Sequence, residues 1–295
     1  MLAAGAAATA AAWLGACGDP GGSAAQRTRT VAAACVPPRG GDHVLAVADG
    51  RPGVLLHIPP HPRAGAPLVV GLAGASQTGA GFAAATGYSR LADRKGFSVA
   101  YPTAAGTRPF WNVSGRVPGR PDDVAYLRDV IAAATRAACA NPARVGVTGV
   151  SNGGGMTARL ACEAADVVTA AALVAGGYSS LPRCRPSRPV AILEIHGTDD
   201  RIVPYAGKGP ARAGSVPALL AQWRRLDRCT GRALRRASLP RVTELRWRDC
   251  SAGTVVAHVR VTDAEHGWPG EADVDGSRTF STTRRTWSFL SSFSR

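Results

Sequence analysis

The chain has 295 residues, of which 45% are hydrophobic and 19% are charged, and its formal net charge is +15. This composition excludes intrinsic disorder and suits one large α/β domain or two small ones. The arginines are scattered and form no basic stretch interleaved with stacking aromatics, so we expect no nucleic-acid binding. Two interpretations of the charge stay open: attraction to an anionic envelope surface, and the base composition of the coding sequence.

The N-terminus is predicted to be a signal peptide with a lipobox, residues 1–17. Residues 1–16 are apolar and alanine-rich, too short to span a bilayer in the usual way, and they end in Leu14-Gly-Ala-Cys17. The segment lacks the basic residues that normally precede the apolar run of a signal peptide. Cys17 is the expected lipidation site, residues 18–30 are predicted to form a flexible tether, and residues 31–295 are predicted to form one domain.

Beyond the tether, segments with strand and helix patterns alternate. Residues 43–58 contain two apolar runs around a Gly/Pro turn, which predicts an antiparallel hairpin. Further strands are predicted at residues 68–72, 97–101, 144–150, 168–174, 189–195 and 255–261. Helices are predicted at residues 82–95, 121–139, 157–162, 216–228 and 278–293. This alternation predicts a mostly parallel central sheet with helices on both faces.

The sequence Gly149-Val-Ser-Asn-Gly153 lies between a short β-branched strand pattern and a helix pattern. A G-x-S-x-G in this context indicates the nucleophile elbow of an α/β-hydrolase. The turn requires small residues two before and two after the serine, because a Cβ there would collide with neighbouring backbone. Ser151 is therefore the predicted nucleophile. The alternative is a glycine loop with an incidental serine.

A serine hydroxyl needs a base, and the base needs an orienting acid; in this fold they follow the serine as Asp or Glu and then His. Asp200 follows the predicted strand 189–195 and is the preferred acid. Asp199 competes with it but is assigned to bracing the turn, and Asp263 is less suitable because it shares a loop with the histidine. His266 follows the last predicted strand in a Gly/Pro loop and is the predicted base.

The other five histidines suit the role less well. Three precede the serine in the chain, and two have structural interpretations, beside the acid or inside the last strand: His43, His57, His61, His196 and His258. The oxyanion hole is predicted to use the backbone N–H groups of Asn152, after the nucleophile, and of Ala75, in the loop after strand 68–72. No His/Cys/Asp cluster has ligand spacing, so neither a metal nor an organic cofactor is expected.

Seven cysteines leave six once Cys17 is assigned to lipidation. An even set in an exported protein predicts three disulfides, with six buried thiols as the alternative. Cys229 and Cys250 flank a single helix–loop–strand connection and are expected to pair. The remaining pairs are then expected to be Cys162–Cys184 and Cys35–Cys139.

Four motifs together resemble the poly(3-hydroxybutyrate) depolymerase, feruloyl esterase and acetylxylan esterase family, and LpqC-type lipoprotein esterases in particular. They are Asp122-Asp-Val-Ala-Tyr-Leu-Arg128, Gly149-Val-Ser-Asn-Gly-Gly-Gly-Met156, His196-Gly-Thr-Asp-Asp-Arg-Ile-Val-Pro-Tyr205 and His266-Gly-Trp-Pro269. The resemblance implies an α/β-hydrolase catalytic domain with Ser151, Asp200 and His266 as its triad, and a lipoprotein anchor at Cys17. It also places Trp111 near the active-site rim.

Two positions depart from this family's usual pattern. Ala73-Gly74 stands where the family usually has His-Gly in the oxyanion loop, which leaves the backbone donor in place. Ala264-Glu265 stands where Gly-Gly usually precedes the base. Glu265 is expected either to raise the basicity of the imidazole or to face solvent, and solvent is the preferred interpretation.

The predicted function is that of a secreted serine carboxylesterase, tethered by lipid to the outer face of the membrane or released. Short-chain esters or hydroxyalkanoate, feruloyl or acetyl ester oligomers are the expected substrates, and no oligomeric state is assigned. Trp111 and Trp268 are predicted to wall the substrate pocket, with packing in the core as the alternative for Trp111. A peptidase or acyltransferase on the same fold and a non-catalytic envelope lipoprotein are the competing functions.

Overall fold

The computed structural model describes residues 35–47, 50–114, 118–178, 184–209, 213–270 and 280–295. The predicted signal peptide, Cys17 and the tether lie outside these ranges. Within them, no helix combines the length and the apolar character that crossing a membrane requires.

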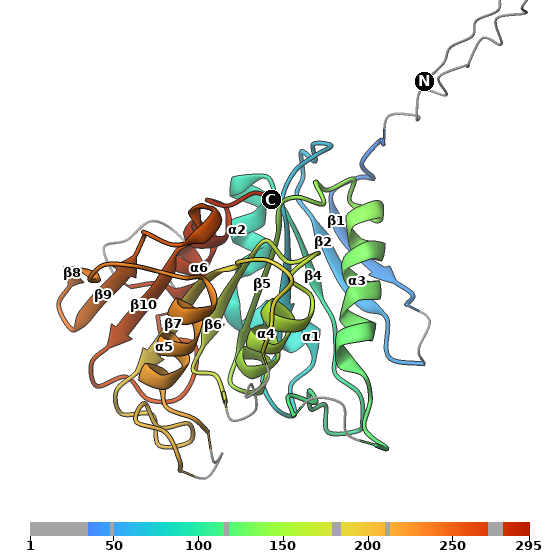
Figure 1. Ribbon diagram of the computed structural model, residues 1–295. Coiled ribbons are helices and arrows are strands. Elements are labelled where there is room, and N and C mark those ends of the chain that lie inside the picture. Colours follow the sequence, from blue (N-terminus) through green and yellow to red (C-terminus); the bar gives the residue numbers. More distant parts are fainter. Residues whose placement is uncertain (1–34, 48–49, 115–117, 179–183, 210–212, 271–279) are drawn as a thin grey trace, which may run out of the picture. The chain divides into compact units, whose positions relative to one another are not determined.

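Ten strands of the described chain form one sheet in the order β1-β2-β4-β3-β5-β6-β7-β10-β9-β8 (Figure 1). Their bounds are β1 Gly41–Leu45, β2 Val54–Ile58, β3 Leu68–Leu72, β4 Ser98–Tyr101, β5 Val145–Val150, β6 Ala170–Val174, β7 Ala191–Gly197, β8 Leu234–Leu239, β9 Val242–Trp247 and β10 Val256–Val261. The six central strands, β4, β3, β5, β6, β7 and β10, pair in parallel. At each edge the pairing is antiparallel: β1 with β2 and β2 with β4 at one edge, and β10 with β9 and β9 with β8 at the other. The predicted α/β class and the predicted N-terminal hairpin are confirmed.

Helices cover both faces of this sheet, and each face has its own apolar core (Figure 1). Helices α3 (Asp123–Ala137), α4 (Asn152–Glu163) and α5 (Val216–Leu226) pack on one face, where Leu127, Leu160 and Trp223 are fully buried. Helices α1 (Gly79–Thr86), α2 (Tyr88–Lys95) and α6 (Thr282–Leu290) pack on the other, where Phe82 and Phe289 are buried. Because strand side chains alternate between the faces, each central strand contributes to both cores.

Two local features differ from the prediction. The single helix expected over residues 82–95 is two helices, because Gly87 adopts the left-handed conformation at φ 65° and its N–H closes α1 on the carbonyl of Ala83. The edge hairpin of β8 and β9 was not predicted. A short 3-10 helix, Ser251–Gly253, connects β9 to β10.

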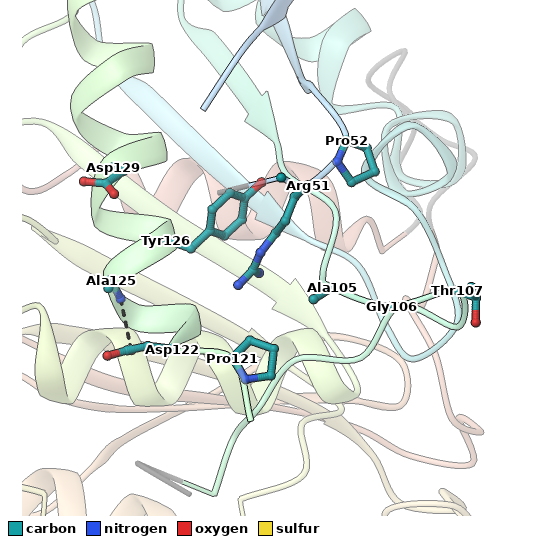
Figure 2. Close-up of a pocket in the computed structure, with 11 residues that line it drawn as sticks. Arg51, Pro52, Ala105, Gly106, Thr107, Pro121, Asp122, Ala125, Tyr126 and Asp129 are labelled. Carbon is teal, nitrogen blue, oxygen red and sulfur yellow. Dashed lines mark hydrogen bonds between the residues drawn. The ribbon is translucent and has the colours of Figure 1, made fainter. Parts of the chain in front are cut away.

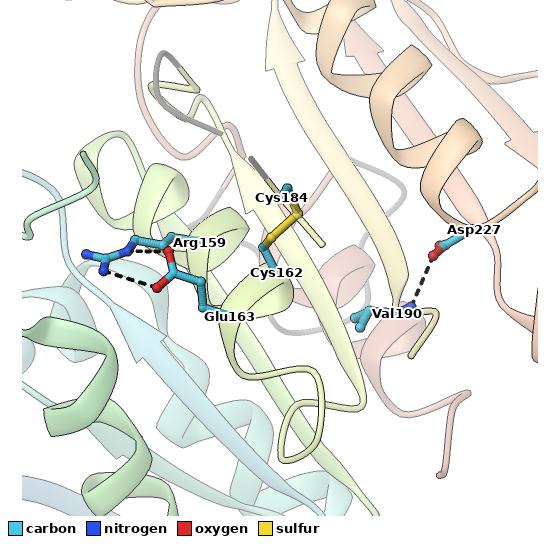
Figure 3. Close-up of a disulfide and its surroundings, with 6 residues drawn as sticks. All are labelled: Arg159, Cys162, Glu163, Cys184, Val190 and Asp227. Atoms are coloured by element: carbon cyan, nitrogen blue, oxygen red, sulfur yellow. Dashed lines mark hydrogen bonds and ion pairs between the residues drawn. A yellow bond between two sulfur atoms is a disulfide. The ribbon is translucent and has the colours of Figure 1, made fainter. Parts of the chain in front are cut away.

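The six described cysteines form the three disulfides that the sequence analysis predicts. Cys35–Cys139 ties the N-terminal end of the described domain to the end of α3, and Cys229–Cys250 links the segments after α5 and β9. Cys162–Cys184 joins α4 to the chain leading into β7 (Figure 3). Each crosslink restricts the unfolded chain and stabilises the fold by about 2–4 kcal/mol.

Candidate active site

Ser151 occupies the sharp turn between β5 and α4. Its backbone has φ 56° and ψ −120°, a conformation that residues with a Cβ rarely adopt. The N–H of Ser151 donates to the carbonyl of Val174 at the end of β6, at 2.9 Å, which anchors the turn to the sheet. The N-terminus of α4 begins directly after the serine, so its free N–H groups and positive dipole end lie beside the hydroxyl.

The glycines around Ser151 allow three backbone segments to approach closely. A Cβ on Gly149 would lie 2.5 Å from the carbonyl oxygen of Gly153, and a Cβ on Gly153 would lie 2.2 Å from that of Leu72. Neither contact is tolerable without moving the backbone. Position 149 therefore requires glycine because α4 approaches it closely, and position 153 requires glycine because β3 does, as the sequence predicts.

Ser151, His266 and Asp200 form one chain of hydrogen bonds. His266 Nε2 lies 2.9 Å from Ser151 Oγ, and His266 Nδ1 lies 2.7 Å from Asp200 Oδ2. The three residues follow β5, β10 and β7, which run parallel, so they meet at the carboxyl edge of the sheet. The side chain of Asp200 is 0% exposed and that of His266 is 21% exposed, so the imidazole borders solvent while its acid is buried.

The charge of Asp200 sets the tautomer of His266. Burial alone would raise the pKa of the Asp200 carboxyl, but hydrogen bonds from His196 and His266 outweigh it and hold that pKa well below its usual range. An ionised carboxylate accepts the Nδ1 proton of His266, which leaves the Nε2 lone pair facing the hydroxyl of Ser151. This arrangement makes His266 a proton acceptor for the serine.

The competing acids lie elsewhere. Asp199 is half-exposed and pairs with Arg201 at 3.6 Å, whereas Asp263 is exposed and lies 3.5 Å from Arg241. The turn is braced by Asp200 itself, whose Oδ1 accepts the N–H groups of the second and third residues after it, at 3.0 and 2.7 Å. The role expected of Asp199 thus belongs to Asp200. Glu265 is exposed, in accord with the solvent-facing interpretation.

The two predicted oxyanion donors lie on segments that flank Ser151. Asn152 is the first residue of α4, where N–H groups have no partner within the helix. Ala75 lies in the loop after β3, and that loop passes the serine closely: a Cβ built on Gly74 would be 3.5 Å from Ser151 Cβ. Among the described residues, neither N–H donates to a backbone acceptor outside the helices and strands.

Trp111 holds these two segments together. Its indole Nε1–H donates to the carbonyl of Ala73 at 3.0 Å, its backbone N–H donates to Asn152 Oδ1 at 2.7 Å, and the Asn152 amide donates back to its carbonyl at 3.0 Å. The side chain is 1% exposed and its ring stacks against Tyr126. Trp111 therefore packs in the core, as the alternative interpretation has it, and it does not wall an open pocket.

Trp268 is buried as well, at 7% exposed. Its ring packs edge-on against Phe82 and Tyr88, and its Nε1–H donates to Thr283 Oγ1 at 3.0 Å. The predicted pair of aromatic walls is therefore wrong for this structure: both indoles lie beneath the surface. Trp268 fixes the loop that carries His266 against α1, α2 and α6.

A cavity of about 720 Å³ lies at the start of α3, where Asp122, Ala125 and Tyr126 line it (Figure 2). The guanidinium of Arg51 lies 3.9 Å from the centre of the Tyr126 ring and pairs with Asp123 at 2.6 Å. None of Ser151, Asp200 and His266 lines this cavity. The ring of Tyr126, which lines the cavity, stacks on the ring of Trp111.

A buried polar network lies behind Asp200, and the sequence analysis missed it. His196 Nε2 is 3.2 Å from Asp200 Oδ2, and His196 Nδ1 is 2.8 Å from Glu194 Oε1. Glu194 also receives the hydroxyl of Tyr178 at 3.0 Å and faces His258 Nδ1 at 2.7 Å. The available signal was Glu194-Ile-His196, two polar residues at i and i+2 in an apolar strand, which places both on one buried face.

The charges of this network are mutually dependent. Burial alone would raise the pKa of Glu194, but hydrogen bonds from His196 and His258 lower it to about 2. Burial alone would lower the pKa of His196, but its hydrogen bonds to Asp200 and Glu194 raise it to about 10. Because the folded pKa of His196 lies above its unfolded value, its contribution to stability is complete below about pH 6.5 and is lost as pH rises through 10.

The elbow geometry predicts unequal costs for two neighbouring glycines. Gly153→Ala places a Cβ 2.2 Å from the Leu72 carbonyl and should lower the free energy of unfolding by about 3 kcal/mol. Gly177→Ala is the matched control, because its Cβ would meet nothing within 4 Å, and we expect a change below about 0.5 kcal/mol. Urea unfolding of both variants measures the difference; equal stabilities would contradict the described contact.

Residues 54–181 match the family model of Esterase PHB depolymerase. The chain is 30% identical over 200 residues to feruloyl esterase B of Piromyces equi, an alignment covering 62% of this chain and 34% of that protein. It is 34% identical over 160 residues to putative esterase NocK of Nocardia uniformis subsp. tsuyamanensis, covering 52% of this chain and 46% of that one. The chain thus spans between a third and a half of the length of these relatives.

Solved structures show the same architecture. Acetyl xylan esterase from Aspergillus awamori superimposes with a TM-score of 0.60 at 17% identity, covering 77% of this chain and 94% of that one. Poly(aspartic acid) hydrolase-1 from Sphingomonas sp. KT-1 superimposes with a TM-score of 0.57 at 15% identity, covering 86% and 98%. At these identities the likeness establishes the fold alone. The chain therefore has the α/β-hydrolase fold of these structures, and its residues 54–181 are similar to the Esterase PHB depolymerase family.

Proposed function

We propose that this protein is a serine carboxylic ester hydrolase with Ser151 as nucleophile, His266 as base and Asp200 as orienting acid. The observation that carries the proposal is the continuous chain of contacts from Ser151 Oγ through His266 to the buried Asp200, at 2.9 and 2.7 Å. The names of the relatives support the reaction class, because they are feruloyl and acetylxylan esterases and a poly(3-hydroxyalkanoate) depolymerase. A non-catalytic lipoprotein would have no need of this alignment.

The geometry supports a two-step acyl transfer. Ser151 Oγ attacks the ester carbonyl while its proton passes to His266 Nε2, and Asp200 stabilises the resulting imidazolium. The N–H groups of Ala75 and Asn152 stabilise the oxyanion, each worth roughly 2.7–4 kcal/mol of the barrier. His266 then returns the proton to the leaving alcohol. Water, activated by the same imidazole, attacks the acyl enzyme and releases the carboxylic acid.

Loss of the nucleophile or the base should abolish most hydrolysis. Ser151→Ala and His266→Ala should each lower kcat for p-nitrophenyl butyrate by roughly 10³-fold or more, because neither residue works without the other. Ser187→Ala and His61→Ala are matched controls, since both positions are exposed. Full activity in Ser151→Ala, with a folded protein by circular dichroism, would disprove the assignment.

We propose short-chain esters or soluble ester oligomers as the substrates. Between Ser151 and Asp200, the described residues form α4, β6 and β7 of the core, with no long apolar insertion of the kind that covers a lipase site. Trp111 and Trp268 are buried, so neither indole offers an open aromatic wall for a long acyl chain. The driving force for binding such a chain is about 0.8 kcal/mol per buried CH₂, so an uncovered site gains little from chain length.

This substrate class predicts a steep preference for short acyl groups. We expect kcat/KM for p-nitrophenyl acetate or butyrate to exceed that for the palmitate by at least about tenfold, because the described residues between Ser151 and Asp200 form no long apolar cover that could bury the palmitate chain. Initial rates below the critical micelle concentration of each ester provide the measurement. Comparable values for all three chain lengths would rule out the short-chain proposal.

We also propose that the protein is exported and held at the outer face of the membrane by lipid on Cys17, with residues 18–30 as the tether. The three disulfides support export, because disulfides persist in oxidising compartments. Cys17→Ser should move the protein from the membrane fraction to the soluble fraction and remove labelling by a clickable fatty acid. Ser23→Ala in the same segment is the control. A wild-type protein that is soluble and unlabelled would refute the anchor.

A further inference from the structure

Two polar residues interrupt the apolar strand β7 on the face that α5 covers. The side chains of Glu194 and His196 are both 0% exposed, and they share this face with the apolar Ile192. Burying ionisable groups is costly unless each is paired and hydrogen-bonded. The network must therefore contain its own compensation, and the contacts of His196 show where the charges lie.

Both ring nitrogens of His196 face acceptors. Nε2 is 2.8 Å from the carbonyl oxygen of Val203 and 3.2 Å from Asp200 Oδ2. A carbonyl oxygen only accepts hydrogen bonds, so Nε2 carries a proton. Nδ1 lies 2.8 Å from Glu194 Oε1, and its state depends on whether Glu194 holds a proton of its own.

Glu194 is surrounded by donors. The hydroxyl of Tyr178 already accepts the N–H of Gly176 at 3.2 Å, so its proton points to Glu194 Oε1 at 3.0 Å. On the other side, His258 Nδ1 lies 3.2 Å from the backbone carbonyl oxygen of Glu194, which only accepts, and 2.7 Å from Glu194 Oε2. The Tyr178 hydroxyl and the His258 N–H both favour the ionised form of the carboxyl. The Asp200 carboxylate on the far side of His196 favours the proton shared by Glu194 and His196 on Nδ1 of the ring.

We propose that His196 is a buried imidazolium which acts as a positioning residue for Asp200, holding the acid ionised and aimed at His266. Its effect on turnover rests on the proposed ester hydrolysis, whereas its charge does not. His196 and His266 contact the same atom, Asp200 Oδ2, at 3.2 and 2.7 Å. The positive ring of His196 therefore opposes protonation of His266 through one shared oxygen, and Glu194 balances that ring from behind.

The charges add to one net negative charge: Glu194 and Asp200 are negative and His196 is positive. Without the positive charge on His196, two carboxylates would lie buried against one neutral imidazole ring. The Asp200 carboxylate, which accepts the Nδ1 proton of His266, would then be far more basic. Several titratable or charged residues reach His196 by hydrogen bonds, ring contacts or strand register: Glu194 on β7, Asp200 and Tyr205 after β7, Tyr178 after β6, His258 and Arg260 on β10 and, through Asp200, His266.

The charge of His196 is testable without any substrate. In protein labelled with ¹⁵N-histidine, we expect both ring nitrogens of His196 to show the shifts of a charged imidazole at pH 8, where a free histidine is neutral. The signal is assigned by its loss in His196→Gln or, if that variant does not fold, by through-bond correlation from its backbone in the wild type. A neutral ring at pH 8 overturns the proposal whatever the activity of the protein.

The positioning role is tested by the acidic limb of the pH profile. His196→Gln removes the cation next to Asp200, so protonation of His266 becomes easier and the midpoint of the limb should move to higher pH by about one unit. His258→Gln is the matched control: it is a buried histidine that also touches Glu194 but has no described contact with Asp200, and its shift should be less than half as large. Equal shifts in the two variants, or none in His196→Gln, would overturn the role.

The same profile is measured twice, as ester hydrolysis and as the rate of fluorophosphonate labelling of Ser151. If the protein labels but does not hydrolyse the esters, the labelling profile still tests His196, and the proposed substrates alone are at fault. If Ser151 does not label at all, the proposed function fails, and the spectrum of the wild type still decides whether His196 is charged.

Discussion

A close contact between three backbone segments determines where the serine stands. Gly149 lies near the end of β5 and Gly153 in the first turn of α4, and a Cβ on either would collide with backbone atoms of the neighbouring segments, including Leu72 at the end of β3. Only this approach allows the chain to reverse at Ser151 with φ 56° and leaves the hydroxyl at the carboxyl edge of the sheet. The same contact places the loop with Ala75 and the N-terminus of α4 on either side of the serine, so nucleophile and oxyanion donors come from one backbone arrangement.

A second constraint is the burial of the acid. A carboxylate with 0% exposure needs partners for every lone pair, and Asp200 obtains them from two backbone N–H groups and two histidines. The free-energy cost of burying the charge of His196 is in turn offset by Glu194. The cost of burying Glu194 is offset by the hydroxyl of Tyr178 and the ring of His258. The proposed triad of Ser151, His266 and Asp200 thus lies at the solvent-facing end of a longer polar network of buried residues.

The sequence predicted the elements whose signals are local. The elbow needs glycines at fixed spacing, and the acid and base follow strands in a fixed order, so Ser151, Asp200 and His266 could be proposed from the sequence, and the structure brings the three side chains together. The break at Gly87 was missed because a glycine within a helical pattern is ambiguous. The Arg-rich hairpin of β8 and β9 was missed because β8 is largely exposed and carries little apolar pattern. Trp111 was placed near a rim by the family resemblance alone; only tertiary packing shows that it braces Ala73 and Asn152.

The central claim is that Ser151 forms a covalent acyl enzyme, and trapping that intermediate tests it most directly. The purified protein is mixed with p-nitrophenyl butyrate, quenched in acid within the first turnovers, digested and examined by peptide mass spectrometry. The account predicts a butyryl adduct on the peptide that contains Ser151, with a burst of p-nitrophenol equal to the enzyme concentration if deacylation is slower than acylation. Steady turnover with the acyl group on a different residue would contradict it.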